Sequence, residues 1–159
     1  MKIQAVRAKD FDFSPYGTYY DLTGREGRML HTFTASYEDH MTAAPLMDTL
    51  PHLGYTIGAS APYTVREMEK HHHTQEAILC MEKPVILCVA LAKDHQAPPH
   101  AEDVRAILIT PGEMVVMNRN VWHDACRGVG ERAGYYWLAK AGDSPAIWEK
   151  VAGEADIEL

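Results

Sequence analysis

The stretch YTVREMEKHHHTQEAILCMEKPVILCVALA, residues 63–92, carries the pattern that decides the fold. Segments 63–70, 77–81 and 84–92 are rich in β-branched, aromatic or apolar residues, and the turn Glu82-Lys83-Pro84 separates the last two. Such residues favour short β-strands, and charged or proline-containing clusters between them favour turns. The stretch therefore predicts three consecutive strands, with a run of three histidines after the first one.

The same pattern continues on both sides of this stretch. Further strand-like segments are found at 29–36, 55–60, 104–109, 113–117 and 134–140. No internal repeat, low-complexity segment or linker divides the chain. The sequence therefore predicts a single all-β domain over residues 1–159, built as a sandwich or jelly-roll barrel.

Helix is expected to be minor and close to the two ends of the chain. One or two helical turns are expected near Lys9–Tyr16. A second helix is expected over residues 143–153, where Ser144 can cap it and Pro145 fits its first position.

Composition narrows the classes of partner and the compartment. The chain has 159 residues, 47% of them hydrophobic, and a formal net charge of −7 without a basic stripe. Nucleic acid and anionic membranes are therefore not expected as partners, and a small molecule or another protein chain is. Three cysteines, an odd number, and the lack of an apolar leader favour a protein of the reducing cytoplasm.

Strand alternation gives the histidine run a chemical meaning, because side chains two residues apart lie on the same face. One face collects two carboxylates and two imidazoles, on Glu67, Glu69, His71 and His73. The other face collects Arg66, Met68, Lys70 and His72. If the first face points into the barrel, its charges need a ligand or one another.

Two segments resemble the two cupin motifs. Residues 112–123 keep the spacing of the second motif, G(x)5PxG(x)2H, from Gly112 to His123, with Asn118 and Asn120 at the Pro and Gly positions. Asn120 is an acceptable substitute because asparagine tolerates the left-handed backbone that a glycine would adopt there.

The first motif, G(x)5HxH(x)3-4E(x)6G, aligns on Glu76 in two ways. The longer gap places His71 and Glu69 at the two His positions, whereas the shorter gap places His72 and Lys70 there. Lysine is a poor metal ligand at neutral pH, so the longer gap is preferred. The expected site then combines Glu69, His71, Glu76 and His123, with His73 as a substitute ligand.

Beyond the cupin motifs, the chain resembles the ureidoglycolate lyase (formerly hydrolase) family over nearly its whole length. The segments that carry this resemblance are KIQAVRAKDFDFSPYG (2–17), APYTVREMEKH (61–71), VRAILITPGE (104–113) and NRNVWH (118–123). The resemblance implies a cupin fold, a homodimer, and cleavage of ureidoglycolate into glyoxylate and urea in allantoin (purine) degradation.

The sequence departs from this family in the expected pocket. The family has one histidine, at the position of His71, where this chain has three. Glu76 stands where a Gln is common, Arg66 where a His can occur, and Met81-Glu82-Lys83-Pro84 replaces a Met-Lys-Gly turn. The fold therefore carries over better than the substrate.

The expected reaction assigns roles to these residues. Breakdown of ureidoglycolate needs a base for the hydroxyl proton and a donor for the urea nitrogen, and His71 and His123 suit both roles. Arg66 or Arg119 could bind the carboxylate, and Trp122 is a candidate substrate contact.

A metal offers another route to the same chemistry. His71, His73, Glu76 and His123 are candidate ligands of a divalent Zn, Mn, Fe or Ni ion, which would polarise the substrate oxygens. No organic cofactor is expected. Two other interpretations stay open: a metal-dependent cupin that isomerises or oxygenates another small hydroxy or keto acid, and a small-molecule-binding cupin without catalysis.

Overall fold

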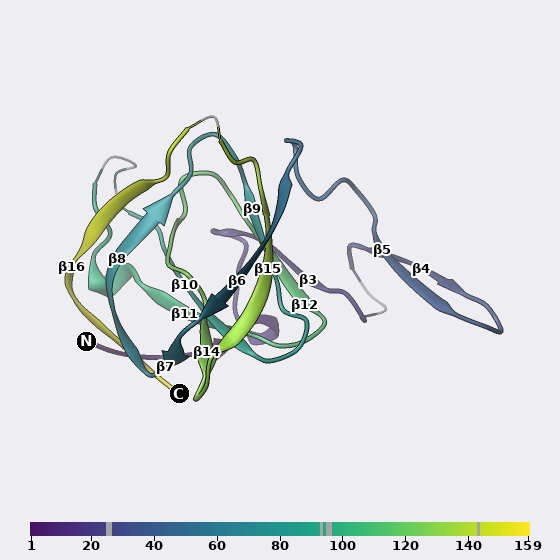
Figure 1. Cartoon of the computed structure of the whole chain (residues 1–159), viewed down its shortest axis with the longest axis horizontal. Helices are drawn as coiled ribbons and strands as arrows, with labels where there is room; N and C mark the ends of the chain where they lie inside the picture. Colours follow the sequence, from purple (N-terminus) through teal and green to yellow (C-terminus); the bar gives the residue numbers. More distant parts are fainter. Residues whose placement is uncertain (25–26, 93, 95–96, 143) are drawn as a thin grey trace.

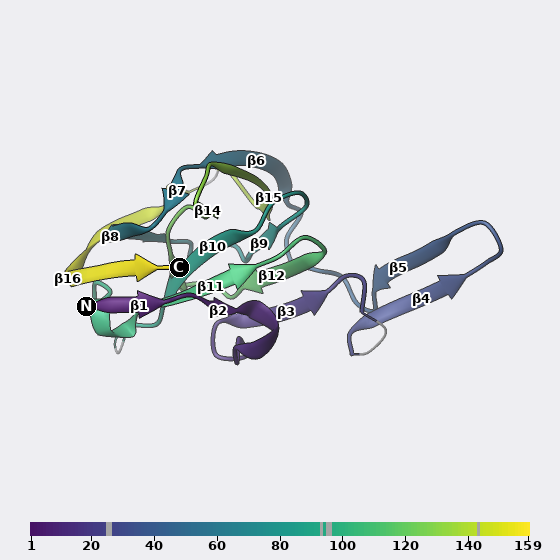
Figure 2. The ribbon, with the colours of Figure 1, turned by 90° about the horizontal axis from the view of Figure 1, so that it is seen from below.

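Two β-sheets face each other in the computed structural model and almost close into a barrel (Figure 1). The structure describes residues 1–24, 27–92, 94, 97–142 and 144–159. A two-stranded arm extends from the barrel, and both chain ends lie on the far side from it (Figure 2). The predicted all-β fold of the cupin jelly-roll type is confirmed.

The larger sheet has nine strands, with the main order β1-β16-β8-β13-β10-β11-β2; β14 also pairs with β10, and β7 pairs with β14. Its strands are β1 (Lys2–Gln4), β2 (Val6–Arg7), β7 (Ser60–Ala61), β8 (Tyr63–Lys70), β10 (Val85–Ala90), β11 (Arg105–Ile109), β13 (Trp122–His123), β14 (Arg127–Val129) and β16 (Ile147–Glu158).

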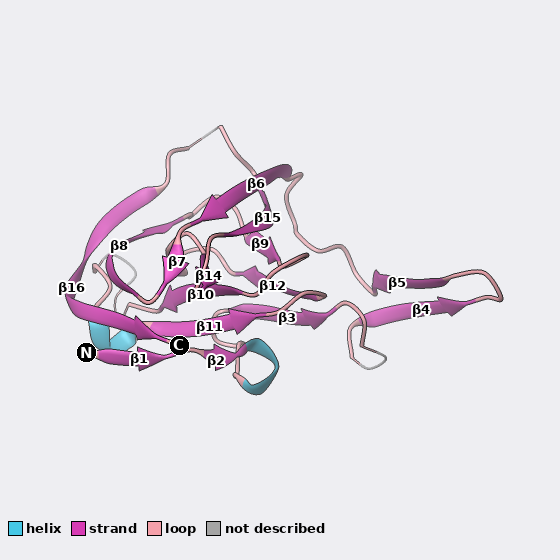
Figure 3. Ribbon diagram, turned by 60° about the horizontal axis from the view of Figure 1, so that its bottom comes forward, coloured by secondary structure: helices cyan, strands magenta, loops and turns pink. Residues whose placement is uncertain are grey.

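The smaller sheet has five strands, in the order β3-β12-β9-β15-β6. They are β3 (Gly17–Asp21), β6 (His52–Gly58), β9 (Glu76–Leu79), β12 (Glu113–Met117) and β15 (Ala133–Ala139). The arm consists of β4 (Met29–Phe33) and β5 (Glu38–Thr42), which pair with each other (Figure 3). Strand β6 ends the smaller sheet on one side.

Strand β10 explains how the core is built. All six of its residues are buried, because alternate side chains enter two different apolar clusters. Val85, Leu87 and Val89 pack between the two sheets, whereas Ile86 and Cys88 pack toward β8 and β16. A strand that is buried on both faces has a continuous apolar sequence, as the residues of β10 do.

The eight predicted strands are confirmed, with some ends shifted by a few residues. The predictions over 63–70 and 113–117 match β8 and β12 from end to end. The N-terminal helix is one 3-10 turn, η1 (Ala8–Asp10), and a second such turn, η2 (Ala101–Asp103), was not expected. Among the described residues, no helix is long and apolar enough to cross a membrane.

The helix expected over residues 143–153 is wrong for the part of this range that the structure describes, which excludes Asp143. From Ile147 onward the chain is β16, paired with β8 on one side and β1 on the other. Gly153 has φ +92°, which a helix does not contain. Pairing with two strands distant in sequence overrides the local helix signal at Ser144 and Pro145.

Candidate active site

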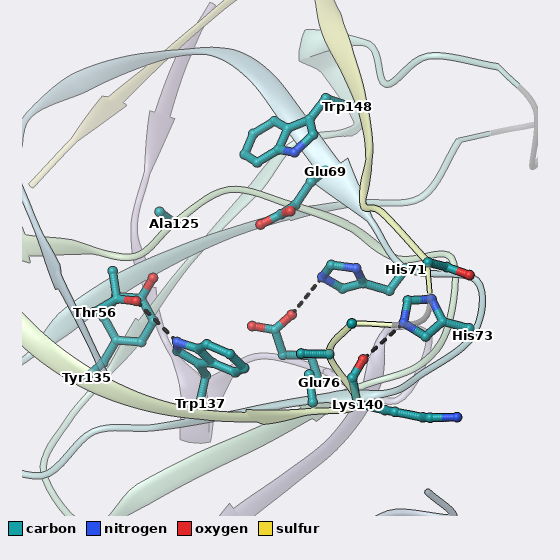
Figure 4. A pocket seen from close by; sticks show the side chains of 14 residues that line it. Thr56, Glu69, His71, His73, Glu76, Ala125, Tyr135, Trp137, Lys140 and Trp148 are labelled. Atoms are coloured by element: carbon teal, nitrogen blue, oxygen red, sulfur yellow. Dashed lines mark hydrogen bonds and ion pairs between the residues drawn. The ribbon is translucent and has the colours of Figure 1, made fainter. Parts of the chain in front are cut away.

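A cavity of about 400 Å³ opens between the two sheets. Figure 4 shows that its lining side chains come from several strands and from the segment before β16. The acidic and imidazole groups of the lining include Glu69, His71 and Glu76. Its aromatic rings are those of Tyr135, Trp137 and Trp148. The expected meeting of charged residues from distant parts of the chain therefore occurs inside the barrel.

Strand pairing brings these residues together. Glu69 on β8 is the direct neighbour of His123 on β13 in the larger sheet. Glu76 starts β9 in the facing sheet, between Met117 and Ala139 of the neighbouring strands. The backbone N–H of Asn120 donates to the carbonyl of His71 at 2.8 Å, which fixes the end of β8.

Asn120 supports this arrangement as the sequence predicts. It is the non-glycine residue with a positive φ, +66°, among those that the structure describes. Asparagine adopts this left-handed conformation at a smaller cost than most residues with a Cβ. The tight turn before β13 therefore forms without the glycine of the cupin motif, and the expectation for Asn120 is confirmed.

Glu76 stands at the centre of the charged cluster. Its Oε2 lies 3.1 Å from Nε2 of His71 and 3.2 Å from Nε2 of His123. Oε1 of Glu69 lies 3.9 Å from the same nitrogen of His123. Nδ1 of His123 donates to the carbonyl of Val121 at 3.0 Å, so its Nε2 is directed at the two carboxylates.

The cluster has an inner and an outer part. His123 is nearly fully buried and is covered by the residues that line the cavity. Glu69, His71 and Glu76 line the cavity and are partly exposed to it. A substrate in the cavity would therefore touch these three groups, with His123 behind them.

Burial and the neighbouring charges shift the pKa values in the cluster. Burial opposes ionisation of Glu76, but His123 and His71 outweigh it and lower the pKa of Glu76 to about 2. Burial also disfavours the charged form of His123, but Glu76, the Val121 carbonyl and Glu69 outweigh it and raise its pKa to about 9. His123 and Glu76 therefore form a buried imidazolium–carboxylate pair at neutral pH.

Glu69 differs from Glu76 although both are carboxylates of the same cavity. Burial is the largest effect on Glu69 and raises its pKa, in spite of the opposing charges of His123 and His71. A carboxylate with a raised pKa accepts a proton more readily than an ordinary one. The site thus contains one firmly ionised carboxylate and one that can exchange a proton.

The residues also fit a metal ion. Glu69, His71 and His123 each offer one ligand atom, and these atoms lie within 4.8 Å of one another. Although Glu76 is close, Nε2 of His123 is buried without a hydrogen bond of good geometry to any described residue. Once His123 releases its Nε2 proton, as metal binding requires, two imidazoles and one carboxylate form a donor set that suits a divalent transition metal.

Two side chains, those of His73 and Lys70, show which side of the end of β8 faces the cavity. His73 lines the cavity, and its Nε2 donates to the carbonyl of Lys140 at 3.0 Å. Lys70 points the other way, with Nζ 4.2 Å from the centre of the Trp122 ring. The alternation predicted from the sequence therefore holds from Met68 onward, and the longer gap of the first motif matches the cluster.

Alternation fails at the start of β8. Glu67, expected beside Glu69, is exposed and lines a separate hollow together with Arg66. Opposite them the pairing register shifts between Lys150 and Ala155 of β16, where extra residues bulge out. This irregularity turns Glu67 away from the cavity, whereas alternation alone already kept Arg66 off the cavity face.

The three expected substrate contacts lie outside the cavity lining. Arg66 belongs to the separate hollow. Arg119 makes a two-pronged ion pair with Asp48, at 2.7 and 2.8 Å. Trp122 is buried in the apolar cluster behind β8. Their substrate-binding role stays a prediction, and it would require these side chains to move.

Sequence reasoning missed the aromatic wall of the cavity. Trp137 lies on β15, where its Nε1–H donates to Oγ1 of Thr56 at 3.2 Å. Trp148 pairs with Glu69 in the β16–β8 register. Aromatic residues in a strand most often signal core packing, and Trp148 falls in the segment expected to be helical. Only the correct pairing of β16 with β8 would have located it.

Comparisons with known proteins complete the description of the site. A solved dTDP-4-dehydrorhamnose 3,5-epimerase from Elizabethkingia anophelis shares 9% identity at a TM-score of 0.48; the match covers 70% of this chain and 66% of the other, slightly under two thirds. Ureidoglycolate lyases from Escherichia coli and Shigella boydii are 24% identical over 126 residues, which is 77% of this chain and 78% of each relative. A family model described as ureidoglycolate lyase matches residues 2–157. The chain belongs to the ureidoglycolate lyase family.

Proposed function

We propose that this protein is a lyase that cleaves ureidoglycolate into glyoxylate and urea. Membership of the family supports the reaction class. The observation that carries the proposal is the shared contact of Glu76 with two imidazoles, at 3.1 and 3.2 Å, beside a cavity of about 400 Å³. A volume of this size suits a small molecule.

The proposed chemistry begins at Glu69. The reaction breaks the C–N bond of the carbinolamide, so the hydroxyl must lose a proton while the urea nitrogen gains one. Glu69 lines the cavity and burial raises the pKa of its carboxyl group. It is therefore assigned as the base that takes the hydroxyl proton.

His71 is assigned as the proton donor to the departing urea nitrogen. It lines the cavity, and its Nε2 is 3.1 Å from Oε2 of Glu76. The ionised Glu76 orients the ring through this contact, as a carboxylate does for a catalytic histidine. His123 acts as a positioning residue, because its buried positive charge keeps Glu76 ionised.

The substrate carboxylate would meet positive charge on the same side of the cavity. His123, whose raised pKa keeps its ring charged at neutral pH, lies directly behind the cavity wall. The planar rings of Trp137 and Trp148 form walls against the flat ureido group. The combination favours a small anionic substrate with a planar amide part.

A metal ion would add to this chemistry. Glu69, His71 and His123 would hold a divalent Zn, Mn, Fe or Ni ion, which acts as a Lewis acid on substrate oxygens. This ligand group favours a second candidate function, a metal-dependent cupin that acts on another small hydroxy or keto acid. Metal analysis of protein purified without a nickel column, combined with the ureidoglycolate assay, separates the two. A stoichiometric ion in protein that does not turn over ureidoglycolate favours the second candidate.

The direct test is turnover. Purified protein is incubated with ureidoglycolate, with and without a chelator, and glyoxylate is assayed. The proposal expects glyoxylate and urea in equal amounts. No turnover at high enzyme concentration, with each candidate metal supplied in turn, would overturn the lyase assignment and favour either the second candidate or a binding protein without catalysis.

A further inference from the structure

Two aromatic rings lie over glycines on opposite faces of the β6–β15 strand pair. On the inner face, a Cβ atom added at Gly54 would overlap the indole of Trp137, its direct cross-strand partner. On the outer face, a Cβ atom added at Gly134 would overlap the hydroxyl end of Tyr55. In both places the ring occupies the space that a side chain at the glycine would need.

The space above Gly54, rather than its backbone, explains why this residue is a glycine. Gly54 lies inside β6, pairs regularly with β15 and is not one of the described glycines with a positive φ. Residues with a Cβ adopt the same strand conformation. Glycine weakens the interior of a strand and often marks a place where another group approaches closely. The group that approaches Gly54 is the indole of Trp137.

The position of the Trp137 indole depends on two residues of β6. Its Nε1–H donates to Oγ1 of Thr56, the next inward-facing residue of the strand, at 3.2 Å (Figure 4). Because Gly54 has no side chain, the indole can lie against β6 and reach this acceptor. The ring also packs against the apolar cluster between the two sheets. Gly54 beneath the ring and Thr56 beside it therefore fix this part of the aromatic wall.

A larger residue at position 54 would narrow the cavity. Thr56 and Trp137 both line it. A side chain at Gly54 would point to the same inner face as Thr56, because alternate residues of a strand share a face, and would lift the indole toward the cavity. At Gly134 the same change would push only the end of Tyr55, which is 53% exposed, into solvent. The inner glycine therefore controls the shape of the cavity, whereas the outer one does not.

We propose that Gly54 is a specificity-determining residue, which positions the Trp137 indole to receive the flat ureido group of the ligand. This inference rests on the proposed function, because it takes the ligand to be a ureido carboxylate. The faces of aromatic rings favour stacked planar groups. A small hydroxy acid without a ureido group would occupy only the part of the cavity beside the charged cluster. Gly54 therefore favours ureido acids over simple hydroxy acids.

Binding of two unreactive acids tests the proposal without turnover. Ureidoacetate is ureidoglycolate without its hydroxyl group, so it cannot be cleaved as a carbinolamide, and glycolate lacks the ureido group. In NMR titrations, Gly54→Ala is expected to weaken ureidoacetate binding by about ten-fold or more, since one extra carbon in a pocket has effects of about 10–200-fold. Its affinity for glycolate should stay near that of the wild type. Gly134→Ala is the matched control and should keep both affinities.

The indole N–H signal of Trp137, assigned with Trp137→Phe, reports the position of the ring directly. It is expected to shift in Gly54→Ala, because the hydrogen bond to Thr56 is lost, and to stay in place in Gly134→Ala. Thr56→Val is a second variant, which removes the acceptor without adding a side chain at position 54. It should shift the same signal and weaken ureidoacetate binding more than glycolate binding.

Three results would overturn the proposal: wild-type protein that binds ureidoacetate no more tightly than glycolate, a folded Gly54→Ala variant with wild-type affinities, or an equal loss of both affinities. If Gly54→Ala does not fold, a Thr56→Val variant with a shifted indole signal and unchanged affinities would overturn it as well. The expected binding pattern in a protein that does not cleave ureidoglycolate would refute the lyase assignment and leave the role of Gly54 standing. Turnover whose KM is unchanged in Gly54→Ala would do the reverse.

Discussion

Two histidine pairs in this molecule have similar ring separations and different surroundings. The ring centres of His71 and His123 are 5.2 Å apart in the barrel, and those of His31 and His40 are 4.9 Å apart on the arm. The barrel pair shares a buried carboxylate, Glu76. The arm pair faces itself, with the two Nδ1 atoms 2.9 Å apart. The buried carboxylate, rather than proximity of two imidazoles, gives the barrel pair its proposed chemistry.

The largest expected effect concerns His71, the histidine of the barrel pair that lines the cavity. His71→Ala is expected to lower ureidoglycolate turnover by about 10²–10⁴-fold, because a positioned proton donor contributes about that much. Its neighbour His72, which is exposed, provides the matched control. His72→Ala should keep near wild-type kcat in the glyoxylate assay. Equal rates for the two variants would remove the proton-donor role of His71.

His123→Gln separates positioning from direct catalysis. The variant removes the buried positive charge that keeps Glu76 ionised, so the pKa of Glu76 should rise. We expect kcat to fall by ~10–10²-fold and the acid side of the pH–rate profile to move to higher pH, with the barrel fold retained. A variant that loses activity without any change in the pH profile would contradict this role.

Much of the fold and part of this site follow from the sequence. Short strands separated by turn residues predicted the barrel, and Asn120 predicted the left-handed turn before β13. The spacing of the histidine run and Glu76 predicted their meeting with His123. These features depend on local conformation or on alternation within one strand, which a sequence displays directly.

The remaining features depend on contacts between distant segments. The bulge that turns Glu67 outward lies on β16, more than eighty residues further along the chain. The same pairing makes Ile147–Glu158 a strand and brings Trp148 to the cavity. Burial of His123 behind Glu76 also depends on how the sheets face each other. No spacing rule in the sequence reports these contacts.

In chelator-treated protein, the His123–Glu76 pair should make the stability of the fold depend on pH. The pKa of Glu76 is lowered from 4.5 to about 2, so its stabilising contribution is present above pH ~4.5 and is lost as the pH falls toward 2. The pKa of His123 is raised from 6.5 to about 9, so its contribution is present below pH ~6.5 and is lost as the pH rises through 9. The pair should therefore stabilise the fold most between these limits.

Glu76→Gln removes this dependence. In the variant, thermal unfolding followed at pH 3, 5.5 and 9 should give a flatter profile of Tm than in the wild type, with the largest loss of Tm at pH 5.5. Measurement with a chelator keeps bound metal from altering the comparison. If Tm depended on pH in the same way in both proteins, the His123–Glu76 pair would not be a source of pH-dependent stability.

The smallest effect is expected on the arm. His40 is part-buried beside His31, and Glu38, the carboxylate near its other ring nitrogen, is 3.7 Å away and mostly exposed. His40→Ala should therefore leave kcat within about two-fold of the wild type, and should change the free energy of unfolding by roughly 0.5 kcal/mol or less. A loss of turnover comparable with that of His71→Ala would show that the arm pair also contributes to catalysis, contrary to the distinction between the two pairs.

Protonation of His123 can be measured most directly by NMR titration of the histidine ring protons in metal-free protein, with His123→Gln used to assign its signal. The buried contact with Glu76 predicts that this ring stays charged through neutral pH and titrates near pH 9. A ring that loses its proton at or below pH 6.5 would contradict the imidazolium–carboxylate pair and, with it, the proposed way in which the cavity orients His71.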